Sequence, residues 1–110
     1  MWLLFLDDIR NPEYVTSCKE TIEQMSIARS SEEAIRLIEE KGMPLHIYFD
    51  HDLGGDDTAM RLVNWMIEKD LDEDILNPEL SFSVHSSNPV GAANIEGTLI
   101  HRLRFKAKNL

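Results

Sequence analysis

Short apolar runs that end at acidic residues indicate the inner strands of a sheet. Residues 2–6 and 45–49 are largely apolar, and they stop at Asp7 and Asp50. Parallel strands that are covered on both faces carry apolar side chains in nearly continuous runs. We therefore expect both runs to be central strands of a parallel sheet.

Apolar residues at helical spacing predict one helix between these runs and another after the second. Ser30 and Glu33 have the spacing of a capping box, and the amphipathic segment that follows closes at Lys41. The short polar residues at 56–58 can cap a further helix, which we expect to end near Asp70.

The remaining segments complete an alternation of strands and helices. Residues 80–84 alternate apolar side chains with serines, as in a strand, and residues 92–103 place an apolar face on a last helix. Residues 11–24 fit neither period, so we expect an irregular segment with helical turns, followed by a short edge strand at 25–28. This order predicts a single α/β domain over residues 1–110, with three layers and a mainly parallel four-stranded sheet.

The charge of the chain limits its partners. A formal net charge of −9 argues against general binding of double-stranded nucleic acid, because clustered Lys and Arg hold phosphate backbones. A small phosphate ligand or the phosphorylated end of an RNA stays compatible with this charge. The basic residues near the C-terminus either complement the dipole of the last helix or contact an acidic ligand or partner. They are His101, Arg102, Arg104, Lys106 and Lys108.

Cysteine content and the first apolar run indicate the compartment. Cys18 is the only cysteine, so it cannot form an internal disulfide, and a reducing environment suits such a chain. The apolar run at 2–6 is too short for a membrane span and lacks the basic flank of a signal peptide. We therefore expect a cytoplasmic protein without a membrane partner.

Acidic residues follow two of the predicted strands at one edge of the sheet. Asp7 and Asp8 follow the first strand, and Asp50 and Asp52 follow the third. In open α/β sheets ligands bind beyond the carboxyl ends of the strands. Carboxylates gathered there repel one another, and Mg²⁺ or another divalent cation relieves that repulsion, as does a raised carboxyl pKa. The alternative is that each acid only caps a turn or helix.

Histidines occur at the same predicted edge. His51 and His85 follow the third and fourth strands. Imidazole accepts and donates protons near neutral pH, so the two side chains can serve as a general acid and base together with Asp50. For each histidine alone, a structural hydrogen bond explains its presence equally well.

Groups that can bind phosphate lie close to these residues in the sequence. Gly54 allows the backbone to approach an anion, and Arg10 either clamps a phosphate or neutralises the neighbouring acids. Three hydrogen-bonding side chains after the fourth strand suit phosphate oxygens, although the same residues also form an ordinary turn before a helix. They are Ser86, Ser87 and Asn88.

Three strings of residues carry a resemblance to a known family. The segments LDDIR at 6–10, FDHDLG at 49–54 and VHSSNP at 84–89 resemble the cyclic-phosphate processing receiver domain, a variant of response-regulator receiver domains. In ordinary receivers, acids placed like Asp7 and Asp8 bind metal, and an acid placed like Asp50 accepts phosphate. The chain departs from that pattern, because it shows no fifth strand with a terminal lysine.

The resemblance implies a truncated, receiver-like (flavodoxin-like) fold and action on cyclic phosphates. Such ligands include RNA ends with a 2′,3′-cyclic phosphate and cyclic nucleotides, in RNA repair or in conflict between phages and bacteria. We therefore expect a phosphoesterase with an acidic metal site and two histidines for proton transfer. Two alternatives stay open: a non-catalytic module that binds a cyclic nucleotide or a partner protein, and a phosphoacceptor receiver that uses Asp50.

Overall fold

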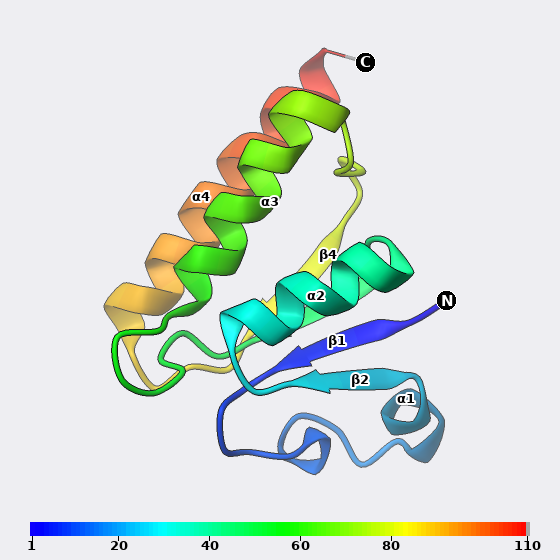
Figure 1. Cartoon of the computed structure of the whole chain (residues 1–110), viewed down its shortest axis with the longest axis vertical. Coiled ribbons are helices and arrows are strands. Elements are labelled where there is room, and N and C mark those ends of the chain that lie inside the picture. The colour runs from blue at the N-terminus through cyan, green and yellow to red at the C-terminus, as the bar shows by residue number, and fades with distance from the viewer. Residues whose placement is uncertain (110) are drawn as a thin grey trace.

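The chain folds around one sheet of parallel strands (Figure 1), in a computed structural model that describes residues 1–109. The elements in chain order are β1 (Leu3–Leu6), the 3-10 helix η1 (Pro12–Tyr14), α1 (Lys19–Glu23), β2 (Met25–Ala28), α2 (Ser31–Lys41), β3 (His46–Phe49), α3 (Ala59–Glu73), β4 (Ser81–Val84) and α4 (Pro89–Lys108). The 4-stranded sheet has the order β2-β1-β3-β4, and every neighbouring pair is parallel. The predicted α/β fold class with a receiver-like arrangement is confirmed.

The elements lie where the pattern places them, with one helix longer than expected. α3 begins after Thr58 as predicted, but it ends at Glu73 and not near Asp70. Asp70 does not end the helix because its side chain is buried and paired with residues of α4. The segment 11–24 is irregular as expected, with only η1 and a short α1 that buries none of its residues.

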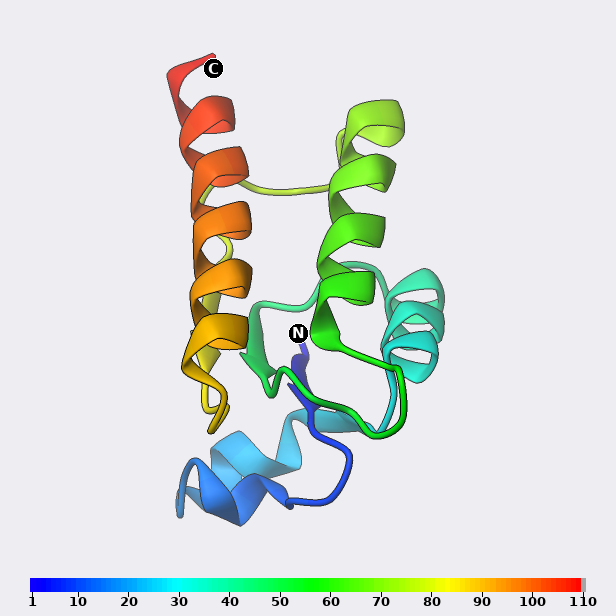
Figure 2. The ribbon, with the colours of Figure 1, turned by 90° about the vertical axis from the view of Figure 1, so that its left-hand side faces the viewer.

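α2, α3 and α4 form one layer on one face of the sheet. They lie side by side in both views (Figures 1 and 2), and α3 contacts each of the other two. The strand register places Leu4, Leu6, Ile47 and Phe49 on this face, and all are fully buried. The main core therefore lies between this face and the helices. Each such side chain stabilises the fold by roughly 1.5–3 kcal/mol when it is buried.

The opposite face of the sheet is covered unevenly. Phe5 is buried there, and the segment with η1 and α1 lies on this side of the strands, away from the other helices (Figure 2). Over β4 the face is polar, because the His46 ring nitrogens lie 2.7 and 3.0 Å from the hydroxyls of Ser81 and Ser83, which are exposed. This explains why β4 alternates apolar and polar residues.

A buried carboxylate joins α3 to α4. Asp70 is 3% exposed, and it accepts hydrogen bonds from Arg102 Nε at 2.9 Å, Lys106 Nζ at 2.5 Å and the Leu76 amide at 2.8 Å. Burial alone raises the pKa of Asp70, but these three donors outweigh burial and lower it. Two of the basic residues near the C-terminus therefore hold the two helices together.

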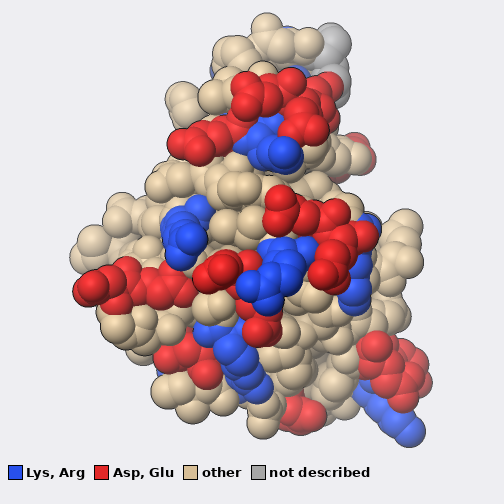
Figure 3. Space-filling model, in the orientation of Figure 1, with Lys and Arg blue, Asp and Glu red and all other residues tan. Residues whose placement is uncertain are grey.

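The surface mixes charges of both signs. On the face shown in Figure 3, Lys and Arg lie among Asp and Glu and form no continuous basic patch. That face therefore offers no extended surface for a phosphate backbone. Within residues 1–109, none of the helices has both the length and the apolar character needed to cross a membrane.

Candidate functional site

Three carboxylates meet at the carboxyl edge of the sheet, as the sequence predicts for this edge. Asp7 and Asp8 follow β1 and Asp50 follows β3, and these acids can each offer an oxygen within 4.8 Å of the others. Asp7 is fully buried and Asp50 is 6% exposed. Hard oxygen donors at this spacing fit Mg²⁺ or Ca²⁺. Asp52 is outside this set of close carboxylates among the described residues.

The pKa values of Asp7 and Asp50 are shifted in opposite directions. Burial alone raises the pKa of Asp7, but the amides of Arg10 and Ile9 and the side chain of His85 outweigh it, so this pKa is lowered. Burial and then the negative charge of Asp7 raise the pKa of Asp50. Asp7 is therefore the fixed negative charge of the site, and Asp50 is the acid that gains most from a neighbouring cation.

Two arginines hold the loop after β1. Arg10 Nη1 lies 3.4 Å from Asp7 Oδ2 and 3.6 Å from Asp50 Oδ2, so it neutralises part of the acidic charge. Arg29 donates from Nη1 to the carbonyls of Asp7 and Arg10 and from Nη2 to Asn11 Oδ1. Arg29 directly follows β2, whose end lies at the same edge, but no motif in the sequence indicated it as a site residue.

His85 is bonded to the central acid of the site. Its Nε2 lies 2.9 Å from Asp7 Oδ2, and since a carboxylate only accepts, Nε2 donates. The ring stacks on Phe5, with centroids 5.2 Å apart and planes 5° apart. Within the described chain, its Nδ1 is buried and has no hydrogen-bond partner. The acid and the Phe5 ring therefore fix the orientation of the imidazole.

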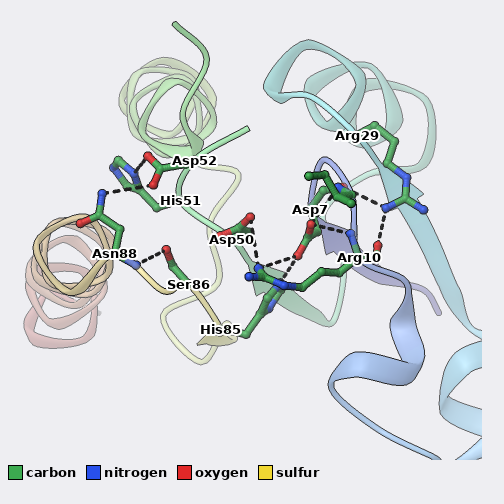
Figure 4. Close-up of polar contacts among 10 residues, drawn as sticks. Asp7, Arg10, Arg29, Asp50, His51, Asp52, His85, Ser86 and Asn88 are labelled. Atoms are coloured by element: carbon green, nitrogen blue, oxygen red, sulfur yellow. Dashed lines mark hydrogen bonds and ion pairs between the residues drawn. The ribbon is translucent and has the colours of Figure 1, made fainter. Parts of the chain in front are cut away.

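His51 is bonded to a different acid. Its Nδ1 lies 3.0 Å from Asp52 Oδ1, and Asn88 Nδ2 donates to Asp52 Oδ2 at 3.3 Å, which together lower the pKa of Asp52. Asn88 also caps α4 by accepting from the Gly91 amide at 2.9 Å. In Figure 4 the two histidines lie on opposite sides of Asp50, so the structure does not bring them into direct contact.

Gly91 fixes the position of the His51 ring. A Cβ atom at Gly91 would lie 2.3 Å from Cγ of His51, far inside van der Waals contact. Gly91→Ala is therefore expected to displace the imidazole and to lower the free energy of unfolding by about 1–3 kcal/mol in urea denaturation.

A second glycine on α4 provides a matched control, and its replacement by alanine is expected to raise the stability of the protein. At Gly97, apart from its chain neighbours and the backbone of its own helix, no atom of the described residues lies within 4 Å of the place of a Cβ. Gly97→Ala is therefore expected to stabilise the protein by about 1 kcal/mol through helix propensity. If both alanine variants are equally stable, the close packing of His51 on Gly91 is wrong.

The glycine loop after β3 lies against the acids. A Cβ at Gly54 would lie 3.5 Å from Asp8 Oδ2, and Gly54 has φ +88, which favours glycine. Asp57 holds the end of this loop, because it accepts hydrogen bonds from the amide and hydroxyl of Ser31 at the start of α2. The loop backbone is thus fixed close to the carboxylates.

Six of the predicted site residues line one small cavity, here called the acidic pocket, and neither His51 nor His85 is among them. Its volume is about 290 Å³. Ser87 lines it, whereas the Ser86 hydroxyl accepts from the Asn88 amide at 3.1 Å and supports the turn before α4. The residues that line the pocket are Asp7, Asp8, Ile9, Arg10, Asp50, Asp52 and Ser87.

The parallel sheet, the acids at its carboxyl edge and the hydroxyl after β4 define a receiver-like domain. The family model described as "Cyclic-phosphate processing Receiver domain" matches residues 2–101. The chain therefore belongs to the cyclic-phosphate processing receiver domain family, as its sequence predicted. No curated protein and no solved structure matches the chain.

Proposed function

We propose that this protein is a phosphoesterase that opens cyclic phosphodiesters, such as the 2′,3′-cyclic phosphate at an RNA end. The observation that carries the proposal is the buried pair of His85 and Asp7, 2.9 Å apart, beside Asp50 and Arg10. A carboxylate that holds one imidazole nitrogen orients the ring, as in hydrolases with a His–Asp pair. The name of the family supports a cyclic phosphate as the ligand.

The chemistry needs one base and one acid on opposite sides of phosphorus. Water adds to phosphorus, its proton goes to one imidazole, and the bond from phosphorus to one ribose oxygen breaks. The other imidazole gives a proton to that leaving oxygen, so the product is a phosphate monoester beside a free hydroxyl. His51 and His85 flank Asp50 in Figure 4, and each is held by a carboxylate through one nitrogen.

The proposal includes a divalent cation at the three close carboxylates. Asp7, Asp8 and Asp50 would hold it, because hard oxygens with unbalanced negative charge suit Mg²⁺. Such an ion supplies positive charge that stabilises the charge on the phosphate oxygens during hydrolysis. Arg10, which already pairs with two of these acids, and the hydroxyl of Ser87 would bind phosphate oxygens from the pocket wall.

The test is hydrolysis of a short RNA that ends in a 2′,3′-cyclic phosphate, with and without a chelator. His51→Ala and His85→Ala are each expected to lower kcat by about 10²–10⁴-fold, because each removes a proton-transfer group. His46→Ala is the matched control, since His46 bonds to Ser81 and Ser83 on the sheet face. It is expected to keep the activity of the wild type.

Other outcomes separate the alternatives. Binding of the cyclic phosphate without product in the wild type would replace the esterase with a binding module. An added phosphate mass after incubation with a small phosphodonor, absent in Asp50→Asn, would favour a phosphoacceptor receiver. Equal loss of activity in His46→Ala would show that the histidine variants act through folding.

A further inference from the structure

An exposed aromatic ring borders the acidic pocket. Tyr14 is the last residue of η1, and 59% of its surface is exposed. The guanidinium carbon of Arg10 lies 4.7 Å from the centre of the Tyr14 ring. The centroid of the same ring lies 5.8 Å from that of His85, with the planes tilted by 60°. Tyr14 therefore contacts two residues of the candidate site, Arg10 and His85.

The lining of the pocket is dominated by charged side chains, which suit a neutral nucleobase poorly. Pockets that enclose drug-sized ligands measure roughly 300–1,000 Å³ and are mostly apolar. The acidic pocket has about 290 Å³, and Ile9 is the one apolar residue in its lining. With a divalent cation at its carboxylates, such a lining would suit a phosphate and the sugar oxygens attached to it. The base of a bound nucleotide then finds better contacts outside, against the rim.

The rim offers the groups that bases stack on. Tyr14 is open to solvent on a large part of its surface, and Ile9 is 78% exposed. Arg10 lines the pocket and also covers part of the Tyr14 ring. Unpaired bases stack on tyrosine rings and on arginine planes, largely without preference for one base.

We infer that Tyr14, backed by Arg10, is a stacking platform for the nucleobase of a ligand whose cyclic phosphate enters the acidic pocket. This inference rests on the proposed function and narrows it. The substrate is then a nucleoside cyclic phosphate, as at an RNA end, in preference to a cyclic phosphate ester without a base. All bases are expected to bind with similar affinity.

The test compares two cyclic phosphates that differ in the base. Dissociation constants of adenosine 2′,3′-cyclic phosphate and glycerol 1,2-cyclic phosphate are measured by calorimetry for the wild type, Tyr14→Ala and Tyr14→Phe, each in a His51→Ala background that prevents hydrolysis during the titration. The wild type is expected to bind the nucleotide about tenfold more tightly, as one stacked base contributes. Tyr14→Ala should remove this preference and keep the affinity for the glycerol ester, whereas Tyr14→Phe should retain both.

A control residue and the contrary results complete the test. Phe105 on α4 is 53% exposed and lies outside the pocket lining, so Phe105→Ala should bind both ligands as the wild type does. A preference that survives Tyr14→Ala overturns the inference. So does equal weakening of both ligands, which would mean that Tyr14 only supports Arg10 and His85. If the wild type binds neither ligand, the proposed function itself fails.

Discussion

Asp70→Ala is expected to lower the free energy of unfolding by about 3–5 kcal/mol at neutral pH, as measured by urea denaturation. The side chain of Asp70 is fully buried, and it bonds to Arg102, Lys106 and the Leu76 amide. Its removal leaves Arg102 and the Leu76 amide without this acceptor, and Lys106 keeps only its bond to Asp74. The cost of such unpaired groups exceeds the value of the ion pair alone.

The stabilisation by Asp70 is expected to be lost at low pH. The pKa of Asp70 is lowered in the folded state, so the stabilisation is present above the ordinary carboxyl pKa and is lost as pH falls through the lowered value. The difference between wild type and variant should therefore shrink below about pH 4. Asp72→Ala, an exposed acid on the same helix, should change stability by less than about 0.5 kcal/mol at any of these pH values. A similar cost for both variants would contradict the role of Asp70.

Mg²⁺ is expected to raise the stability of the wild type and to leave Asp50→Asn almost unchanged. An ion that binds only the folded state adds about 2.7 kcal/mol at 100 times its Kd. Asp50 is one of the acids whose oxygens lie within 4.8 Å of each other, and its raised pKa reflects burial and the charge of Asp7. The amide removes that repulsion, so without Mg²⁺ the variant should be at least as stable as the wild type.

The matched control for the cation is the acid outside the close set. Asp52 bonds to His51 and Asn88, so Asp52→Asn should keep most of the gain in Tm with Mg²⁺. Thermal unfolding with increasing Mg²⁺ measures all three proteins. An equal gain in wild type and Asp50→Asn would remove Asp50 from the cation site, and loss in Asp52→Asn would restore Asp52 as a ligand.

The sheet and its helices were predictable because their signals are local. The apolar run at residues 2–6 and the capping box at Ser30 depend on period and spacing, and both elements formed as expected. The end of α3 was not predictable. Asp70 resembles a solvent-exposed acid near a helix end, and only contact with Arg102 and Lys106, far along the chain, makes it an interior residue.

The edge of the sheet at which the candidate site lies was predictable from the sequence. Asp7 and Asp50 end neighbouring parallel strands, so topology alone brings them together. The partner of each histidine was not predictable, because the choice of Asp7 by His85 depends on side-chain direction. Tyr14 lies in a segment without a clear period, so nothing in the pattern indicated that it borders the site.

The short outer strand β4 has a consequence for self-association. Among residues 1–109 it has a strand neighbour on one side only, and such an edge can pair with a strand of another chain. β4 spans only 4 residues, and the hydroxyls of Ser81 and Ser83 already bond to His46. A short edge with serines on its open face is a poor template for cross-β stacking. Replacing these serines with valine would turn it into an aggregation-prone surface.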